Sequence, residues 1–303
     1  MGVCNMKKVL VLGGSGFVGR HVVAALARAG HSITVPTRRW AHAKHLITWP
    51  QVTVHELDVT DPRALQALVR GHDVVIHLVA VLHGDEARFE RLHVDLPVAV
   101  AQACAHARVP HLVHMSALGA DAHGPSMYQR SKGRGELALA EIAKTKGLRL
   151  TVLRPSVIFG SDDRFINLFA RMQRVVPLVP LAGASARFQP VWVQDVAQAV
   201  AQVVQRLALQ GRTYELGGPQ VLTLAELVRH AGRWVQCPRP IVPLPQAVAW
   251  LQALLMELAP GEPLMSRDNL ASMQRDNVLG HAWPGLPELG LGRGQALGTV
   301  FRV

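Results

Sequence analysis

A glycine-rich turn near the start of the chain constrains its fold more than any other feature. Residues 8–12 (KVLVL) predict a buried strand, and residues 13–19 (GGSGFVG) follow it directly. Residues 17–29 then repeat apolar side chains at helical spacing and end at Gly30. Glycines at 13, 16 and 19 permit a tight turn, close backbone approach to a pyrophosphate at the positive helix end, and close helix–strand packing. A merely flexible turn is the alternative, and the strand–turn–helix context disfavours it.

Short apolar runs alternate with helical patterns through the first half of the chain. Further strands are predicted at residues 33–35, 52–57, 74–79, 112–115 and 150–153. Asp61 and Pro62 open one of the intervening helices with a cap and a proline at the first helical position. Strands rich in Val, Ile and Leu that are separated by helices predict parallel βαβ units. We therefore expect an α/β fold with a Rossmann-type, doubly wound parallel sheet.

After Pro155 the regular alternation of strands and helices becomes weaker, and frequent prolines separate shorter elements. Residues 194–209 predict one clear helix, and Thr213–Leu216 predicts a strand. We expect a nucleotide-binding domain at 1–155 and a smaller, discontinuous α/β domain at 156–303 for a substrate or partner. The helix at 194–209 is expected to pack back onto the first domain.

Charge limits the choice of partner. The formal net charge of +11 favours an anionic partner, which could be a phosphorylated cofactor, a membrane surface, nucleic acid or an acidic protein. The arginines are scattered along the chain, and only two tyrosines are present as stacking platforms besides Trp and Phe. We therefore expect no nucleic-acid partner.

The positions of the cysteines, histidines and apolar residues indicate the cellular compartment and whether a metal site is expected. Cys4, Cys104 and Cys237 lie far apart, which favours a reducing compartment over a disulfide framework or zinc site. No segment reaches the roughly 18 uninterrupted apolar residues of a membrane span, and residues 1–8 hold no signal-peptide core. The closest histidine pairs, 42/45 and 111/114, lack HExxH spacing. We expect a cytoplasmic protein without a metal site.

The end of the second predicted strand bears on cofactor choice. A site that prefers NAD places an acid about 20 residues past the glycines, where it binds the adenosine 2′-hydroxyl. Here the strand ends at Thr37, Arg38 and Arg39, and no acid precedes Glu56. Two guanidinium groups suit a 2′-phosphate, so we expect NADP(H) in preference to NAD(H). The alternative is a pair of solvated arginines.

A YxxxK spacing at Tyr128 and Lys132 supplies candidate chemistry. Residues i and i+4 share a helix face, so Lys132 is expected to lie beside Tyr128. The Lys132 ammonium is expected to lower the pKa of the Tyr128 phenol and to hold the nicotinamide ribose. Tyr128 is expected to exchange a proton with a substrate oxygen. Ser116 ends the fifth strand and is expected to hold that oxygen. For Ser116, a serine that merely caps the strand end is the alternative.

Taken together, these segments resemble an extended or atypical short-chain dehydrogenase/reductase, of the NAD(P)-dependent epimerase/dehydratase type. More narrowly, the chain is similar to bacterial relatives of the NDUFA9 subunit of mitochondrial complex I. The resemblance rests on GGSGFVG (13–19), HMSALGA (114–120), SMYQRSKGRGE (126–136), LRPSVIFG (153–160), DDRF (162–165) and FQPVWVQDVAQA (188–199). The narrower similarity adds ELGGPQVLTLAEL (215–227) and PGEPLMSRDNLASM (260–273).

The resemblance implies a Rossmann fold with Ser116, Tyr128 and Lys132 at the catalytic positions. It also implies that Arg154, Pro155, Ser156 and Val157 follow the sixth strand and face the nicotinamide. The expected cofactor contacts, from the motifs and the resemblance together, are Gly13, Gly14, Ser15, Gly16, Phe17, Val18, Gly19, Thr37, Arg38, Arg39, Asp58, Val59, Leu78, Val79, Ala80, Met115, Tyr128, Lys132, Pro155, Ser156 and Val157.

Two functions remain open at this point. The first is an NADP(H)-dependent oxidoreductase or epimerase-type enzyme that acts on a small carbonyl or hydroxyl compound, with the substrate unassigned. The second is a non-catalytic, NADPH-holding component associated with complex I, peripheral at the inner face of the membrane. The second draws on residues 241–258, which carry the single charge of Glu257. For this segment, core packing is one reading, and a surface helix that touches a membrane or partner is the other.

Overall fold

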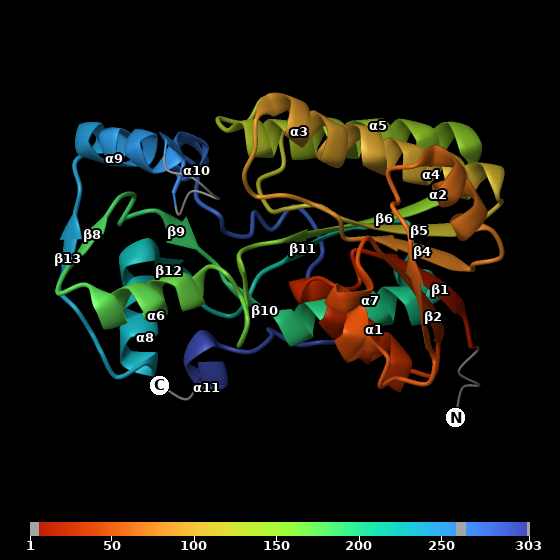
Figure 1. Ribbon diagram of the computed structural model, residues 1–303, viewed down its shortest axis with the longest axis horizontal. Helices are drawn as coiled ribbons and strands as arrows, with labels where there is room; N and C mark the ends of the chain where they lie inside the picture. Colours follow the sequence, from red (N-terminus) through yellow and green to blue (C-terminus); the bar gives the residue numbers. More distant parts are fainter. Residues whose placement is uncertain (1–5, 259–264, 302–303) are drawn as a thin grey trace.

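The computed structural model describes residues 6–258 and 265–301 (Figure 1). Cys4 and residues 260–264 of the segment that supports the narrower resemblance lie outside the described residues.

A seven-stranded parallel sheet forms the centre of the molecule, in the order β11-β6-β5-β4-β1-β2-β3. The strand order reverses between β1 and β4, and such a switch point opens a ligand crevice at the carboxyl ends of the strands. The doubly wound α/β fold is thereby confirmed. The seven strands are β1 (Lys8–Leu12), β2 (Ser32–Thr37), β3 (Val52–Glu56), β4 (Val74–His77), β5 (His111–Met115), β6 (Arg149–Pro155) and β11 (Thr213–Leu216).

Helices cover both faces of this sheet, because its apolar strands must be buried on both sides. In Figure 1, α1 (Phe17–Arg28) and α7 (Val193–Gln205) lie below the sheet and pack against each other. The opposite face carries α2 (Pro62–Val69), α4 (Leu96–His106) and α5 (Met127–Lys146), with α3 (Glu86–Glu90) and the π-helical turn η2 (Arg91–Asp95) leading into α4. A short 3-10 helix, η1 (Trp40–Leu46), links β2 to β3. Asp61 caps α2 by accepting the N–H of Arg63, as the sequence predicts.

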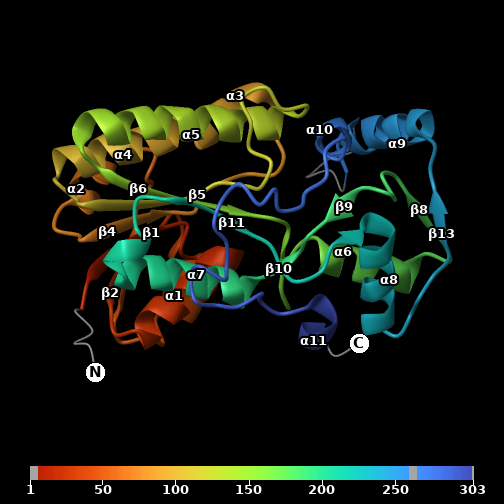
Figure 2. The same ribbon diagram turned by 180° about the vertical axis from the view of Figure 1, so that it is seen from behind.

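A second lobe lies beyond the carboxyl ends of the strands and has its own apolar cluster, which includes Phe159, Phe169 and Leu227. The chain enters this lobe after β6, returns to the sheet for α7 and β11, and leaves again, and the last segment crosses back over the sheet (Figure 2). The division at residues 155 and 156 stays a prediction. The remaining elements are β7 (Ile158–Phe159), α6 (Ile166–Val175), β8 (Val179–Leu181), β9 (Arg187–Phe188), β10 (Val191–Trp192), η3 (Leu207–Leu209), β12 (Leu222–Thr223), α8 (Leu224–Trp234), β13 (Ile241–Pro243), α9 (Gln246–Leu258), α10 (Arg267–Ser272) and α11 (Leu297–Phe301).

In the segment at 241–258, Ile241 packs against the core cluster of the second lobe, but α9 does not pack as a core helix, so the core-packing reading is wrong for most of the segment. The segment forms β13 and α9, and α9 buries only its small residues Ala249 and Ala253. Trp250, Leu255 and Leu258 are exposed by 49%, 60% and 74% of their surface. The fully buried residues of α9 are alanines, and most of its bulky side chains point outward. Within the described residues, no helix is long and apolar enough to cross a membrane.

Candidate active site

The glycine-rich turn is formed by backbone contacts that side chains would obstruct. A Cβ on Gly19 would lie 2.1 Å from the carbonyl oxygen of Gly13 and 2.6 Å from Cα of Gly14. Gly13 itself has a φ of +85°, in the region that favours glycine. A Cβ on Gly14 would lie 2.8 Å from Cγ1 of Val35. The turn therefore holds α1 directly on the ends of β1 and β2.

The N-terminus of α1 is suited to an anion. Its N-cap residue is Gly16, which is exposed and offers no side chain to satisfy the first N–H groups of the helix. The first turn of α1 carries no acidic residue. Ser15, Phe17 and Val18 are partly exposed at the same end. A phosphate would meet N–H donors and the positive end of a helix dipole at this point.

The residues after β4 lie directly against this turn. A Cβ on Gly13 would approach the backbone of Leu78 and Val79 at 3.2 and 3.3 Å. Strand β4 ends at His77 rather than at residue 79, so Leu78 and Val79 belong to the loop that follows it. The structure thus brings the turn together with Leu78 and Val79 at the carboxyl ends of β1 and β4, as a shared nucleotide site requires.

The end of β2 presents two exposed arginines. Arg38 and Arg39 are solvent-exposed, while the Thr37 hydroxyl is buried and donates to the carbonyl of Arg39. Hydrogen bonds from the backbone and side chain of Thr60 lower the pKa of Asp58, and the positive charge of Arg38 makes a smaller contribution in the same direction. An acid also reaches this end of the sheet: Glu56 pairs with Thr37 in the β2–β3 register, and its Oε2 accepts the N–H of Trp40 at 2.9 Å.

Tyr128 and Lys132 lie on the first turns of α5, and the start of that helix is fixed locally. Ser126 accepts the N–H of Gln129, and the two form a capping box. One turn further, Lys132 is 2% exposed, and its Nζ donates to the carbonyl of Met115 at 3.2 Å. Ser116 is the next residue of that strand end and is buried. The structure therefore brings Lys132 to the carboxyl end of β5, beside Ser116.

The buried groups here have shifted pKa values. Burial raises the pKa of the Tyr128 phenol to about 12, opposite to the lowering expected from Lys132. Burial alone accounts for the raised pKa of Tyr128, while the Lys132 ammonium donates to the carbonyl of Met115. Burial also lowers the pKa of Lys132 to about 8, with Glu136 partly opposing the change. Among the described residues, the Ser116 hydroxyl has no hydrogen-bond partner although it is buried. Such a group suits an incoming ligand oxygen.

Two stacked histidines lie under the same strand ends. His77 and His114 occupy facing positions of β4 and β5, with Nδ1 atoms 3.1 Å apart and rings inclined by 10°. A neutral pair shares one proton between these two nitrogens. Burial lowers the pKa of His77 to about 3 and that of His114 well below its usual value. No group of three or more metal-binding side chains occurs in the part of the chain that the structure describes.

The expectation that residues 154–157 follow the sixth strand is wrong for Arg154 and Pro155, because β6 extends to Pro155. Arg154 lies within β6, and its guanidinium pairs with Glu136 and with Glu215. The Ser156 hydroxyl contacts Asn277, which lies 121 residues away in the chain. Its side chain is therefore already bound within the protein, while Pro155 is buried and Val157 is partly buried.

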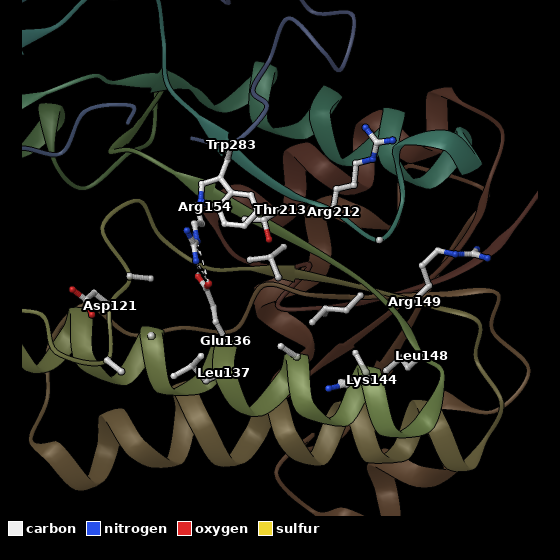
Figure 3. Close-up of a pocket in the computed structure, with 18 of the residues that line it drawn as sticks. Asp121, Glu136, Leu137, Lys144, Leu148, Arg149, Arg154, Arg212, Thr213 and Trp283 are labelled. Carbon is white, nitrogen blue, oxygen red and sulfur yellow. Dashed lines mark hydrogen bonds and ion pairs between the residues drawn. The ribbon is translucent and has the colours of Figure 1, made fainter. Parts of the chain in front are cut away.

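A separate groove of about 1020 Å³ lies between α5 and strands β6 and β11. In Figure 3, Glu136 of α5 points at Arg154, and Trp283 lies beside that pair. Lys144, Arg149 and Arg212 line the other end. Arg154, which the resemblance places at the nicotinamide, lines this groove, and none of the other expected nucleotide contacts does.

Sequence reasoning missed three polar residues that support the site. Asp268 of α10 accepts the N–H groups of Met127 and Tyr128 at 2.6 and 3.1 Å and so caps α5. Asn277 holds Ser156, and His93 contacts Tyr128 edge to face at 5.5 Å. No local pattern identifies Asp268 or Asn277. For His93, the signal is the mid-helix glycine at 135, which indicates a close backbone approach to α5.

The open helix end, the switch point beside it and the Tyr–Lys turn at the end of β5 define a dinucleotide-binding protein of the Rossmann type. The sequence profile of the NAD dependent epimerase/dehydratase family matches residues 9–217. The chain belongs to this family.

The relatives that resemble the chain include a subunit of NADH dehydrogenase and a reductase. It is 32% identical over 291 residues to the Mus musculus protein "NADH dehydrogenase (ubiquinone) 1 alpha subcomplex subunit 9, mitochondrial", with 93% of this chain and 75% of the mouse protein covered. It is 30% identical over 235 residues to "Ceramide reductase" from Caulobacter vibrioides, with coverage of 76% and 68%. The solved structure of DesIV, a dTDP-glucose 4,6-dehydratase from Streptomyces venezuelae with NAD and TYD bound, shares the fold. Its TM-score is 0.69 at 23% identity, with coverage of 79% and 85%.

Proposed function

We propose that this chain is an NADP(H)-dependent oxidoreductase that acts on a small carbonyl or hydroxyl compound. Tyr128 is the acid/base, Lys132 supports it, and Ser116 orients the substrate oxygen. The observation that carries the proposal is the buried Lys132 ammonium, held on the carbonyl of Met115 at the end of β5. A charge is costly to bury, and perturbed buried groups in such a place mark functional sites.

The residues divide the work as follows. A bound nicotinamide supplies or accepts the hydride. The Ser116 hydroxyl, unpartnered among the described residues, holds the substrate oxygen. In the direction of reduction, the Tyr128 phenol gives its proton to that oxygen, and Lys132 stabilises the phenolate that remains. Because burial raises the pKa of Tyr128 to about 12, the phenol is protonated at neutral pH, which is the form that donates a proton in reduction.

The preference for NADP(H) rests on Arg38 and Arg39. Both are exposed beyond Thr37, and guanidinium groups bind a 2′-phosphate in bidentate fashion. Glu56, the acid nearest to Thr37 in the sheet register, has its Oε2 engaged by the N–H of Trp40. An acid that would favour a free 2′-hydroxyl is thus already bound to the backbone.

The proposal is tested by nucleotide binding. Thermal stabilisation and fluorescence titration are measured with NADPH and NADH, for the parent chain and for Arg38→Ala/Arg39→Ala. A matched control is Arg63→Ala/Arg70→Ala, which removes two exposed arginines elsewhere. We expect NADPH to bind at least about tenfold tighter than NADH, and the double variant at 38 and 39 to lose this preference. Binding of neither nucleotide would overturn the proposal.

Turnover is tested separately with a panel of aldehydes and ketones, by following the consumption of NADPH. Tyr128→Phe is expected to lower the rate by at least about a hundredfold while nucleotide binding persists. Equal rates for the parent and Tyr128→Phe would remove Tyr128 from the chemistry.

A second candidate function is favoured by the exposed apolar face of α9. In this alternative the chain holds NADPH without turnover, as a component bound to a respiratory complex at the inner face of the membrane. Trp250, Leu251, Leu255 and Leu258 face solvent on one helix, and Arg267 lies over the Trp250 ring at 5.4 Å. The naming of the mouse relative as an NADH dehydrogenase subunit supports this alternative.

This candidate is tested by co-sedimentation with vesicles of anionic or neutral phospholipid. We expect binding to anionic vesicles that is lost in Trp250→Glu/Leu255→Glu. The control is Leu207→Glu, which changes an exposed leucine of η3. Equal binding by the parent and the α9 variant would show that α9 does not contact the membrane.

A further inference from the structure

A π-helical turn, η2, precedes α4 and carries the buried residue His93. Such turns are rare and occur frequently at functional sites, because an extra residue in the turn redirects a side chain. The turn also presses on α5, since a Cβ on Gly135 would lie 2.0 Å from the carbonyl oxygen of His93. Glycine at 135 therefore permits the approach that places the His93 side chain against α5.

Both ring nitrogens of His93 are engaged, and their partners determine the tautomer. The N–H of Val81 donates to Nε2 at 3.2 Å, so the proton of the neutral ring must be on Nδ1. Nδ1–H then donates to Oγ of Ser131 at 2.8 Å. The Ser131 hydroxyl donates in turn to the carbonyl of Tyr128 at 2.9 Å. Burial, with a smaller contribution from Lys132, lowers the pKa of His93 to about 3, so the ring is neutral at ordinary pH.

The same ring contacts the Tyr128 side chain. The two rings meet edge to face, with centroids 5.5 Å apart and an interplanar angle of 87°. Phe89 adds a second edge contact to Tyr128 at 6.2 Å and packs on His93 at 5.3 Å. Val81, at the other end of the chain of hydrogen bonds, follows directly on Leu78–Val79–Ala80, the segment beside the glycine-rich turn.

We propose that His93 is a positioning residue that couples the loop after β4 to Tyr128, so that the phenol is held in one orientation and responds when nucleotide occupies the loop. The coupling runs through Val81, His93 and Ser131 and through the edge contact of the two rings. The inference rests on the proposed role of Tyr128 as acid/base. It assigns to His93 no contact with substrate or cofactor.

The small number of tyrosines makes a direct measurement possible. The sequence holds two, and the other one, Tyr214, is a buried residue whose hydroxyl donates to Leu209. In a full-length Tyr214→Phe parent, tyrosine labelled with carbon-13 at Cζ alone therefore gives a single NMR signal, that of Tyr128. This signal is recorded in the free protein and during titration with NADPH, in the parent and in His93→Leu, His93→Gln and Ser131→Ala.

The matched control is His111→Leu. His111 is likewise 1% exposed, has a pKa lowered by burial to about 3, and is hydrogen-bonded to a hydroxyl, that of Thr151. It lies at the opposite end of β5 from Ser116. A variant there disturbs a buried histidine of the same kind without touching Tyr128.

We expect one sharp signal in the parent and in His111→Leu, and a broadened or split signal in His93→Leu and Ser131→Ala. The shift caused by NADPH should be largely lost in these two variants, while NADPH affinity changes by less than about tenfold, the usual ceiling for one neutral hydrogen bond. His93→Gln can accept from Val81 but lacks the donor at the Nδ1 position, so it should also fail to restore the signal.

An unchanged Tyr128 signal in both His93→Leu and Ser131→Ala would overturn the inference and leave the proposed function standing. If the parent binds no nucleotide, the proposed function fails, and the signals of the free proteins still decide whether His93 holds Tyr128. Should His93→Leu not fold, the smaller change Ser131→Ala decides the question alone.

Discussion

The glycine-rich turn and helix α9 expose opposite kinds of group. The turn offers backbone N–H groups at an uncapped helix end and excludes side chains by contacts as short as 2.1 Å. Helix α9 buries two alanines and turns tryptophan and leucine side chains to solvent. The turn is specified by contacts within the chain, so a change there should alter folding. On the outer face of α9, Arg267 lies over the Trp250 ring, but Leu255 and Leu258 are largely exposed, so a change at these leucines should alter only what the protein binds.

The largest effect is expected for Gly19→Ala. The new Cβ would meet two backbone groups, which cannot rotate away, so we expect a loss of about 3 kcal/mol or more in the free energy of unfolding. Nucleotide binding should be lost with it. Urea unfolding measures the first effect, with Gly30→Ala as the control. Gly30 also has a positive φ but no atom within 4 Å of an added Cβ, so its cost should be only about 1 kcal/mol. Equal losses in both variants would show that close helix–strand packing is not the reason for Gly19.

Lys132→Met is expected to stabilise the protein. The folded-state pKa of about 8 lies below the usual 10.5, a difference worth about 3 kcal/mol against the buried charge. The unfolded chain therefore binds more protons between pH 8 and 10.5, and parent stability should rise with pH across that window. The advantage of Lys132→Met should accordingly be greatest below pH 8 and shrink above it. Melting curves at several pH values measure this, with Lys144→Met, on the exposed face of α5, as the control. A pH-independent difference would contradict the prediction.

A smaller effect is expected where the two lobes meet. Asp268→Ala removes the acceptor of the Met127 and Tyr128 N–H groups, which should cost about 1 kcal/mol, as for a lost helix cap. It should also loosen Tyr128, which Asp61→Ala, the removal of the α2 cap, should not do. Denaturant unfolding and the Tyr128 NMR signal separate the two variants. Identical tyrosine signals would mean that α10 gives no support to the site.

The smallest effect on folding is expected from α9. Leu255→Ser/Leu258→Ser changes two exposed side chains and should shift the free energy of unfolding by no more than about 0.5 kcal/mol. Ala253→Asp on the buried face should cost much more. If Leu255→Ser/Leu258→Ser lowers the free energy of unfolding as much as Ala253→Asp does, the outer face of α9 packs within the molecule. The outer face of α9 would then be fixed by contacts within the chain, as the glycine-rich turn is.

The sequence predicts the fold well wherever a short stretch of chain determines the structure. The turn at 13–19 and the cap at Asp61 each depend on neighbours within a few residues. Strand ends depend on tertiary pairing and were predicted less well. Pairing of Leu216 with Pro155 extends β6 two residues beyond its predicted end.

The supporting residues of the site lie beyond the reach of local patterns. Ser156 and Asn277 are 121 residues apart, and Asp268 lies 141 residues from Met127. Only packing of the second lobe on the sheet brings them together. The outer face of α9 was ambiguous for another reason: an apolar run of this length is equally typical of a buried helix, and only the position of its alanines decides which side faces the core.

The two glycines within α5 have a consequence for protein engineering. Replacing glycine by alanine inside a helix is a standard way to raise thermostability, and by helix propensity alone each replacement should contribute nearly 1 kcal/mol. At Gly133 an added Cβ would lie 2.2 Å from the backbone nitrogen of Ala122, and at Gly135 2.0 Å from the carbonyl of His93. In a consensus or laboratory-evolution library that enriches alanine along α5, variants with alanine at these two positions will therefore be less stable. Both glycines should be kept in any redesign of the helix.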